Sequence, residues 1–137
     1  MNFHIDIVSL QGSIYSGEAS EVILPSTEGE ITVLSRHMPI VTTLTLGEVV
    51  VKTPTDTINL LIGKGVFSFS DGLGRLLVED VRFSDEISEE KVLEAKKTAE
   101  ELIEKGVKGE EKERAAYALR KSLFDLKIVR RKKKRLL

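Results

Sequence analysis

The chain has 137 residues, of which 41% are hydrophobic, enough for one ordinary domain or a compact domain with a smaller appendage. Cysteine is absent, which excludes a disulfide framework and thiol chemistry and fits a reducing compartment. The first ten residues lack the basic and apolar regions of a secretion signal, and no run approaches the roughly 18 apolar residues of a spanning helix, so we expect neither export nor a membrane span.

The net charge of -1 averages three unlike segments. Residues 1–84 carry 5 basic and 10 acidic groups, and residues 85–113 carry 6 and 11, so each segment has a net charge of -5. Residues 114–137 carry 10 basic groups against one acidic group, a net charge of +9. Such asymmetry is typical of a chain end that meets an acidic partner.

Up to residue 84, apolar and polar residues alternate with a period of two, which predicts short strands. The predicted strands cover residues 3–9, 21–24, 30–34, 47–53, 57–62, 66–70 and 75–81. Pro, Asp and Gly mark hairpin turns at residues 53–56 and 70–74. Seven or more strands at this spacing favour a β-sandwich or a flattened barrel.

The segment IGKGVFSFS, residues 62–70, is the only glycine-rich candidate for a phosphate loop. A phosphate loop needs a helix after its glycines, followed by Lys and Ser or Thr at fixed spacing. Here a strand follows the glycines, so we predict a hairpin turn instead.

After residue 85 the apolar period changes to 3.6, which predicts two helices. Ser88 is the expected N-cap of the first helix, Glu89 and Glu90 suit its first turn, and Gly106 is the expected C-cap. The predicted helix seams are Val92, Ala95, Ala99 and Leu102 in the first helix, and Ala115, Leu119, Ser122, Leu126 and Val129 in the second. The sequence thus predicts a β + α chain, with a β-sandwich over residues 1–84 and an antiparallel two-helix hairpin over residues 85–137.

Catalysis has little support in these residues. His4 and His37 are the only histidines, and they are expected in different strands without a matching Asp and Ser pair, so a triad is disfavoured. Glu28 and Glu30 belong either to a solvated rim or to a contact surface. The run RRKKKR, residues 130–135, is either a solvated helix end or a docking site for an acidic protein, RNA or anionic lipid.

The whole pattern resembles the epsilon subunit of F-type ATP synthase. The segment STEGEITVLSRHMPIVTTLTLGEVVV, residues 26–51, is similar to the family signature of Glu-Gly-Glu, an apolar run, Gly-His-x-Pro, a strand and a Leu-Gly turn. The opening FHIDIVSLQGSIYSGEASEVILP and the helical segments EAKKTAEELIEKG and RAAYALRKSLFDLKIV are also similar to the family. The order and spacing of these motifs along nearly the whole chain are specific.

The resemblance implies a sandwich of about ten strands followed by a helix pair, in a non-catalytic central-stalk subunit without cofactors. Such a subunit joins the gamma shaft to the membrane ring of c subunits during proton-driven ATP synthesis, and its helices can extend along gamma to inhibit ATP hydrolysis. Glu30 and His37 match family positions that face the loops of the c ring, at one end of the sandwich. The implied location is peripheral, on the cytoplasmic face of a bacterial inner membrane or on a plastid thylakoid.

The same resemblance gives the basic tail a hypothetical role. In the extended state, Arg130, Arg131, Lys132 and Lys133 would contact acidic segments of the catalytic beta subunits and block hydrolysis. Exposed ion pairs contribute only about 0 to 1 kcal/mol each, so several must act together and inhibition should weaken with salt.

The chain departs from the family pattern at three places. Ser35 and Arg36 replace the usual Pro-Gly before the loop histidine, and Lys64 replaces one of two adjacent glycines. Some bacterial members bind ATP through an Ile/Leu-Asp-x-x-Arg-Ala motif, where this chain has Lys91 in place of Arg and lacks the Asp and Ala. Lysine has no planar bidentate fork, so we expect weak or no regulatory ATP binding.

Two other classes remain as alternatives. A nucleic-acid-binding β-domain with a basic helical tail is the first, although its strand domain is acidic and poor in aromatic residues for base stacking. An enzyme on a similar sandwich is the second, and the lack of a nucleophile, base and orienting group counts against it.

Overall fold

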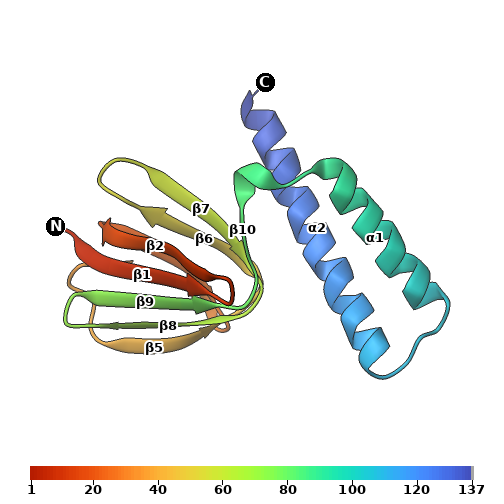
Figure 1. The fold of residues 1–137 in the computed structure, drawn as a ribbon, viewed down its shortest axis with the longest axis horizontal. Helices are drawn as coiled ribbons and strands as arrows, with labels where there is room; N and C mark the ends of the chain where they lie inside the picture. Colours follow the sequence, from red (N-terminus) through yellow and green to blue (C-terminus); the bar gives the residue numbers. More distant parts are fainter. Residues whose placement is uncertain (137) are drawn as a thin grey trace. The chain divides into compact units, whose positions relative to one another are not determined.

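The computed structural model describes the backbone of residues 1–136 and their side chains, except at position 85 and positions 132–136. The chain divides into two compact units, residues 1–83 and 84–137. The first unit is all β and the second is helical (Figure 1). We describe each unit by itself.

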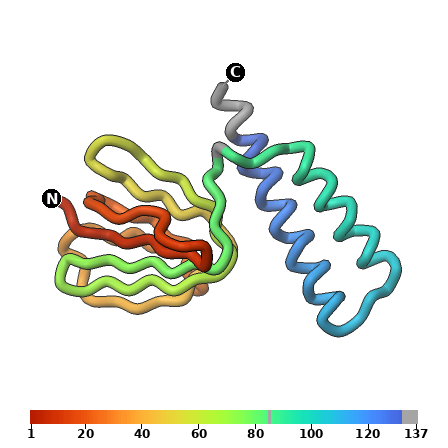
Figure 2. Tube along the Cα trace, in the orientation of Figure 1, coloured from red at the N-terminus to blue at the C-terminus, as the bar shows by residue number. Residues whose placement is uncertain are grey.

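Ten strands form the first unit as one continuous hydrogen-bonded sheet that encloses a core (Figures 1 and 2). The strands are β1 Phe3–Ser9, β2 Gly12–Ala19, β3 Glu21–Ser26, β4 Gly29–Leu34, β5 Ile40–Leu44, β6 Gly47–Lys52, β7 Thr57–Ile62, β8 Gly65–Ser70, β9 Leu73–Val78 and β10 Val81–Phe83. Their order is β10-β7-β6-β3-β5-β8-β9-β1-β2, with β4 paired to β3 outside this path. All pairs are antiparallel except β1 with β9, which run parallel. The β-sandwich and its ten strands are therefore confirmed.

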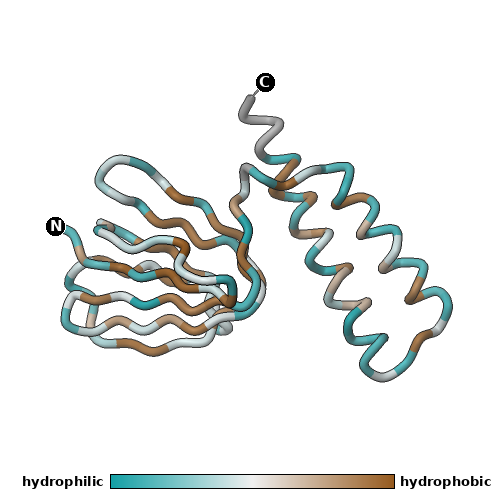
Figure 3. The backbone as a smooth tube through the Cα atoms, viewed as in Figure 1, coloured by the Kyte–Doolittle hydropathy of each residue, from teal (hydrophilic) through white to brown (hydrophobic). Residues whose placement is uncertain are grey.

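The sandwich is held together by alternate residues of its strands, which point inward because successive side chains of a strand lie on opposite faces. Ile5, Val22, Leu60 and Phe67 are fully buried, and they come from four different strands. Phe3 and Phe69 add an edge-to-face ring contact with centroids 5.3 Å apart. Figure 3 shows this as apolar residues concentrated along the strands, with polar residues at the turns. Aliphatic residues from both halves of the sheet thus supply a core that needs no tryptophan.

Two of the predicted turns are confirmed. Residues 53–56 connect β6 to β7, with the Thr53 amide donating to the Asp56 carbonyl at 2.8 Å. Asp71 and Gly72 connect β8 to β9 with φ values of 50° and 73°. Asp-Gly hairpin turns require these positive φ values, which explains why the Asp-Gly pair predicted the turn correctly.

The hairpin turn predicted within residues 62–70 is wrong. β7 pairs with β6 and β10, whereas β8 pairs with β5 and β9, so residues 63–64 carry the chain from one part of the sheet to another. The crossing is fixed by backbone hydrogen bonds of 3.0 Å from Gly63 to Asp80 and from Glu79 to Lys64. A Gly-rich connection shows only that the chain turns, because the pairing partner is chosen by tertiary contacts.

Three strands were missed by the alternation of apolar residues. β2, GSIYSGEA, is rich in Gly and Ser and has few apolar residues, since it lies at the end of the sheet. β5, IVTTL, pairs with β8 although threonines interrupt its apolar positions, and β10 has only three residues. Peripheral and short strands carry weak periodic signals because fewer of their side chains are buried.

The second unit contains a short 3-10 turn at Ser84–Glu86 and two helices, α1 Glu89–Glu104 and α2 Glu110–Leu136, which pack against each other. Ser88 is the N-cap, and its hydroxyl accepts from the Lys91 amide at 3.5 Å. Gly106, with φ of 75°, follows the C-cap residue Lys105. The predicted hairpin and the Ser88 N-cap are confirmed, whereas the C-cap is Lys105, one residue before the predicted Gly106.

The predicted seam of α2 is largely confirmed, and that of α1 is partly wrong. Ala115, Ser122, Leu126 and Val129 of α2 are buried and Leu119 is half-buried. In α1, Val92 and Ala99 are buried, whereas Ala95 is exposed and Leu102 is 38% exposed. Ala95 and Leu102 instead line a shallow groove along the hairpin, because small residues leave space between the helices.

Candidate interaction surfaces

The loop between β4 and β5 presents His37 at one end of the sandwich. The His37 amide donates to the Leu34 carbonyl at 3.0 Å, and its Nδ1 lies 2.6 Å from the Met38 carbonyl oxygen, to which Nδ1–H donates. The imidazole also stacks edge-on against the buried Phe69, with centroids 6.3 Å apart. These contacts hold the loop in one conformation, and Met38, with 74% of its surface exposed, projects from it.

Glu30 lies at the start of β4, directly after the turn that joins β3 to β4, and is exposed. The Ser26 hydroxyl donates to the Gly29 carbonyl and accepts from the Glu28 amide at 3.3 Å. The Thr27 amide adds a bond of 3.1 Å to Thr43 on the neighbouring strand. The Glu30 carboxylate therefore follows a turn that several hydrogen bonds hold in place.

Glu30 and His37, the two residues that the family resemblance assigns to the c ring, lie near the two ends of β4 along the chain. Four residue steps of β4 separate Glu30 from Leu34, and His37 lies beyond Leu34. At about 3.3 Å per residue, the Cα atoms of Glu30 and Leu34 lie roughly 13 Å apart along the strand. The assignment of Glu30 and His37 to one contact surface stays a prediction.

A row of exposed apolar residues crosses the outer face of the sheet, and sequence reasoning missed it. Val66 of β8 pairs with Leu77 of β9, and Leu77 pairs with Val8 of β1. These side chains are 40%, 54% and 38% exposed, respectively. We call Val8, Val66 and Leu77 the outer apolar row. The alternation of side chains along a strand could have revealed the row, because Leu77 directly follows the buried Leu76 and must therefore face outward.

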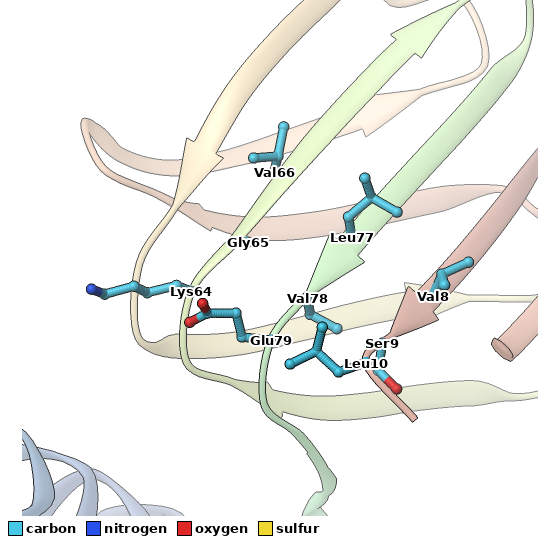
Figure 4. A pocket seen from close by; sticks show the side chains of 9 residues that line it. All are labelled: Val8, Ser9, Leu10, Lys64, Gly65, Val66, Leu77, Val78 and Glu79. Carbon is cyan, nitrogen blue, oxygen red and sulfur yellow. The ribbon is translucent and has the colours of Figure 1, made fainter. Parts of the chain in front are cut away.

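The outer apolar row continues into a groove of about 470 Å³ at one end of these strands (Figure 4). Leu10, 80% exposed, extends the apolar lining. Lys64 and Glu79 line the same end, each just outside its strand, and Figure 4 shows the Lys64 side chain extending away from the groove. A groove with an apolar floor and charged groups at its end has the composition of a protein-binding surface.

His4 has a neighbouring Asp and Ser after all, which corrects the expectation from the sequence. Its Nε2 lies 2.9 Å from Asp6 Oδ1 and 3.3 Å from Ser16 Oγ, and Ser16 Oγ donates to the same Asp6 oxygen at 2.6 Å. In a catalytic triad the two imidazole nitrogens contact Asp and Ser separately. Here Nε2 of His4 contacts both Asp6 and Ser16, so the three residues form a polar cluster between β1 and β2 without the geometry of a triad. The Ser16 hydrogen bond, followed by the His4 hydrogen bond, lowers the pKa of Asp6.

The uninterrupted basic run, residues 130–135, lies in the C-terminal part of α2. Arg130 and Arg131 are exposed, whereas the side chains of Lys132 and Lys133 lie outside the described residues. Lys91 is exposed in the first turn of α1, one turn after the N-cap.

Within the described residues, no helix has the length and apolarity that crossing a membrane requires. The same part of the chain holds no cluster of three or more His, Cys, Asp or Glu residues that suits a metal ion.

Comparison with known proteins decides the family. Residues 2–83 match the family model described as ATP synthase, Delta/Epsilon chain, beta-sandwich domain. The chain belongs to this family. It is 32% identical over 134 residues to the ATP synthase epsilon chain of Nitrosomonas eutropha, which covers 97% of this chain and 96% of that protein. It is 36% identical over 104 residues to ATP synthase epsilon chain 1 of Methylococcus capsulatus, covering 75% and 74% of the two chains.

Solved structures show the same fold. A chain in the mitochondrial ATP synthase of Euglena gracilis, described as OSCP/F1/c-ring, superposes with a TM-score of 0.80 at 18% identity, covering 90% of this chain and 78% of that chain. A chain in the central stalk and c-ring of the Tetrahymena thermophila mitochondrial ATP synthase gives a TM-score of 0.62 at 15% identity, covering 90% and 91%. The family model and the curated relatives together confirm the resemblance to ATP synthase epsilon chains.

Proposed function

We propose that the chain is a non-catalytic rotor subunit of an F-type ATP synthase, which joins the gamma shaft to the c ring. The outer apolar row is the observation that carries this proposal beyond the family assignment. Three apolar side chains aligned across neighbouring strands are exposed on this sheet. Covering them with a partner protein would bury apolar surface and so favour binding. The described relatives are ATP synthase epsilon chains, which supports gamma as that partner.

The rigid turns supply the second contact of a coupling subunit. Glu30 is exposed at the start of β4, His37 is half-buried in the loop after β4, and we assign both to contacts with the loops of the c ring. A continuous sheet between gamma and the ring transmits torque without shearing, since its strands are cross-linked by hydrogen bonds along their whole length.

The helical unit has the proposed role of inhibiting ATP hydrolysis. Arg130 and Arg131, with Lys132 and Lys133, would contact acidic segments of the catalytic beta subunits when the hairpin extends. Each exposed ion pair contributes about 0 to 1 kcal/mol, so inhibition requires several pairs and weakens as salt screens them. In this arrangement the subunit is held at the cytoplasmic face of a bacterial inner membrane only through its partners.

The contact with gamma is tested by changing the outer apolar row. Leu77→Glu places a charge in the proposed interface, and Leu34→Glu is the matched control, since the two leucines are 54% and 53% exposed. We expect Leu77→Glu to weaken binding to a purified gamma subunit by at least about tenfold, because losing one buried leucine contact costs about 1.5 to 3 kcal/mol. Equal effects of the two variants would refute the assignment of this face to gamma.

The role in the enzyme is tested with an ATP synthase depleted of its epsilon subunit. Adding the full chain should restore coupled proton pumping and lower ATP hydrolysis, whereas residues 1–83 should restore coupling without inhibition. A chain that ends at residue 129 should bind but inhibit less, and the difference should shrink at high salt. Failure of both the full chain and residues 1–83 to bind would contradict the rotor assignment.

A further inference from the structure

The open edge of β2 carries an interaction that neither the family nor the rotor role explains. β2 lies at the end of the strand order, and in the part of the chain that the structure describes its one hydrogen-bonded neighbour is β1. An unpaired strand edge offers N–H and C=O groups on which another chain can add a strand. An open edge of this kind must be protected if strand addition by another chain is to be avoided.

The register shows which groups of β2 face outward. The His4 amide donates to Gly72 at the start of β9, so His4 directs its backbone groups toward β9 and away from β2. Glu18, opposite His4, is therefore a non-hydrogen-bonded position, and its N–H and C=O point away from β1. The same alternation sends the groups of Ser16, opposite Asp6, outward. A register shift between Ile7 and Val8 then interrupts the ladder, so Ser16 to Glu18 is the regular part of this edge.

Tyr15 covers this part of the edge. Its hydroxyl donates to the outward carbonyl of Glu18 at 2.8 Å, while its ring packs partly against the core. The ring tip lies over Gly17, where a Cβ would come within 2.8 Å of the hydroxyl oxygen. Gly17 thus leaves the space through which Tyr15 reaches the edge.

We propose that Tyr15 closes the open edge of β2 and prevents a second copy of this chain from adding a strand there. The hydroxyl occupies an acceptor position of the outward Glu18 carbonyl, and the aromatic ring lies next to the path of an incoming strand. A second copy is the occupant that the geometry favours, because two identical edges pair antiparallel about a two-fold axis. This role needs no partner from the rotor and acts before assembly.

The test compares Tyr15→Phe with Tyr117→Phe in the full chain. Both variants lose one hydroxyl, and Tyr117 is the other tyrosine of the chain, in α2. Sedimentation velocity over a wide concentration range measures self-association. We expect the dissociation constant of the Tyr15→Phe dimer to fall by about 30-fold relative to wild type, since each of two caps contributes about one hydrogen bond. Tyr117→Phe should match wild type.

Amide hydrogen exchange then locates the interface. In the Tyr15→Phe dimer, the outward amides of Ser16 and Glu18 should become protected as concentration rises. Gly17→Ala should give the same dimer, because its Cβ displaces the Tyr15 hydroxyl but leaves the Tyr15 ring in place. This variant replaces Tyr15→Phe in the test if Tyr15→Phe does not fold. Variants that remain as monomeric as wild type would overturn the proposal, and so would self-association that leaves these two amides unprotected.

Discussion

Leu76 and Leu77 are adjacent leucines of β9 on opposite faces of the sheet, and they provide a direct test of the structure. Leu76 is fully buried in the core, whereas Leu77 is 54% exposed in the outer apolar row. We therefore expect Leu76→Ala and Leu77→Ala, which delete the same atoms, to have opposite consequences. The first should affect the free energy of unfolding and the second should affect binding.

The expected magnitudes differ severalfold. A fully buried leucine replaced by alanine loses about 3 to 5 kcal/mol, because the lost transfer free energy adds to the cost of the cavity. An 83-residue unit has a free energy of unfolding of roughly 4 to 12 kcal/mol, so Leu76→Ala removes a large share of it. With an m value of about 1 to 1.5 kcal/mol per molar urea, the unfolding midpoint should fall by roughly 2 to 5 M. Leu77→Ala should stay within about 0.5 kcal/mol of wild type.

The assay is equilibrium unfolding in urea, followed by NMR signals of the sandwich methyl groups, which separate this unit from the helices. Equal losses for the two variants would refute the two-faced description of β9. A larger loss for Leu77→Ala would show that the register is shifted by one residue, since such a shift moves every side chain to the other face.

Three further predictions concern other parts of the chain. The pKa of Asp6 is lowered from its ordinary value of 3.8, first by the Ser16 hydrogen bond. The ionised carboxylate therefore stabilises the folded chain above pH 3.8, and this stabilisation is lost as the pH falls through the lowered pKa. The difference in urea midpoint between wild type and Asp6→Asn should accordingly disappear in acid. Gly65→Ala should cost about 1 to 3 kcal/mol in urea unfolding, because its Cβ would meet a carbonyl oxygen of β9 at 2.6 Å. Gly74→Ala, whose Cβ would keep at least 3.4 Å from its neighbours, should cost less, and the reverse order would contradict the packing. Calorimetric titration with ATP should show no micromolar binding, because Lys91 lacks the bidentate fork of arginine, and tight binding would refute this.

Local features of the fold were predictable because their causes lie within a few residues. Ser88 caps α1 through its own hydroxyl, and Gly106 ends it with a positive φ. Asp71 and Gly72 make the β8–β9 turn for the same kind of reason. The connection after Ile62 was mispredicted because its glycines determine a change of direction, while the choice of pairing partner depends on strands elsewhere in the chain.

The candidate surfaces were only partly predictable. Glu30 and His37 were selected from a motif, and both lie near turns, but their separation by β4 follows from strand length and register. The groove beside Lys64 was not predicted, because the strand period does not show which apolar residues stay exposed on the outer face of a sheet. The exposed leucine at position 77 was marked only by its position next to a buried one.

The sequence by itself determined the inward and outward alternation of the strands, the ends of α1, the segregation of basic charge into the last segment and membership in the epsilon family. Only the tertiary structure decided that β1 lies parallel to β9, about 70 residues later in the chain. That pairing aligns Val8 with Leu77 and so creates the outer apolar row. The β1–β2 pairing likewise brings His4 beside Ser16 and leaves Glu18 on the open edge. Such features depend on which distant strands pair and in what register, and local propensity does not encode that choice.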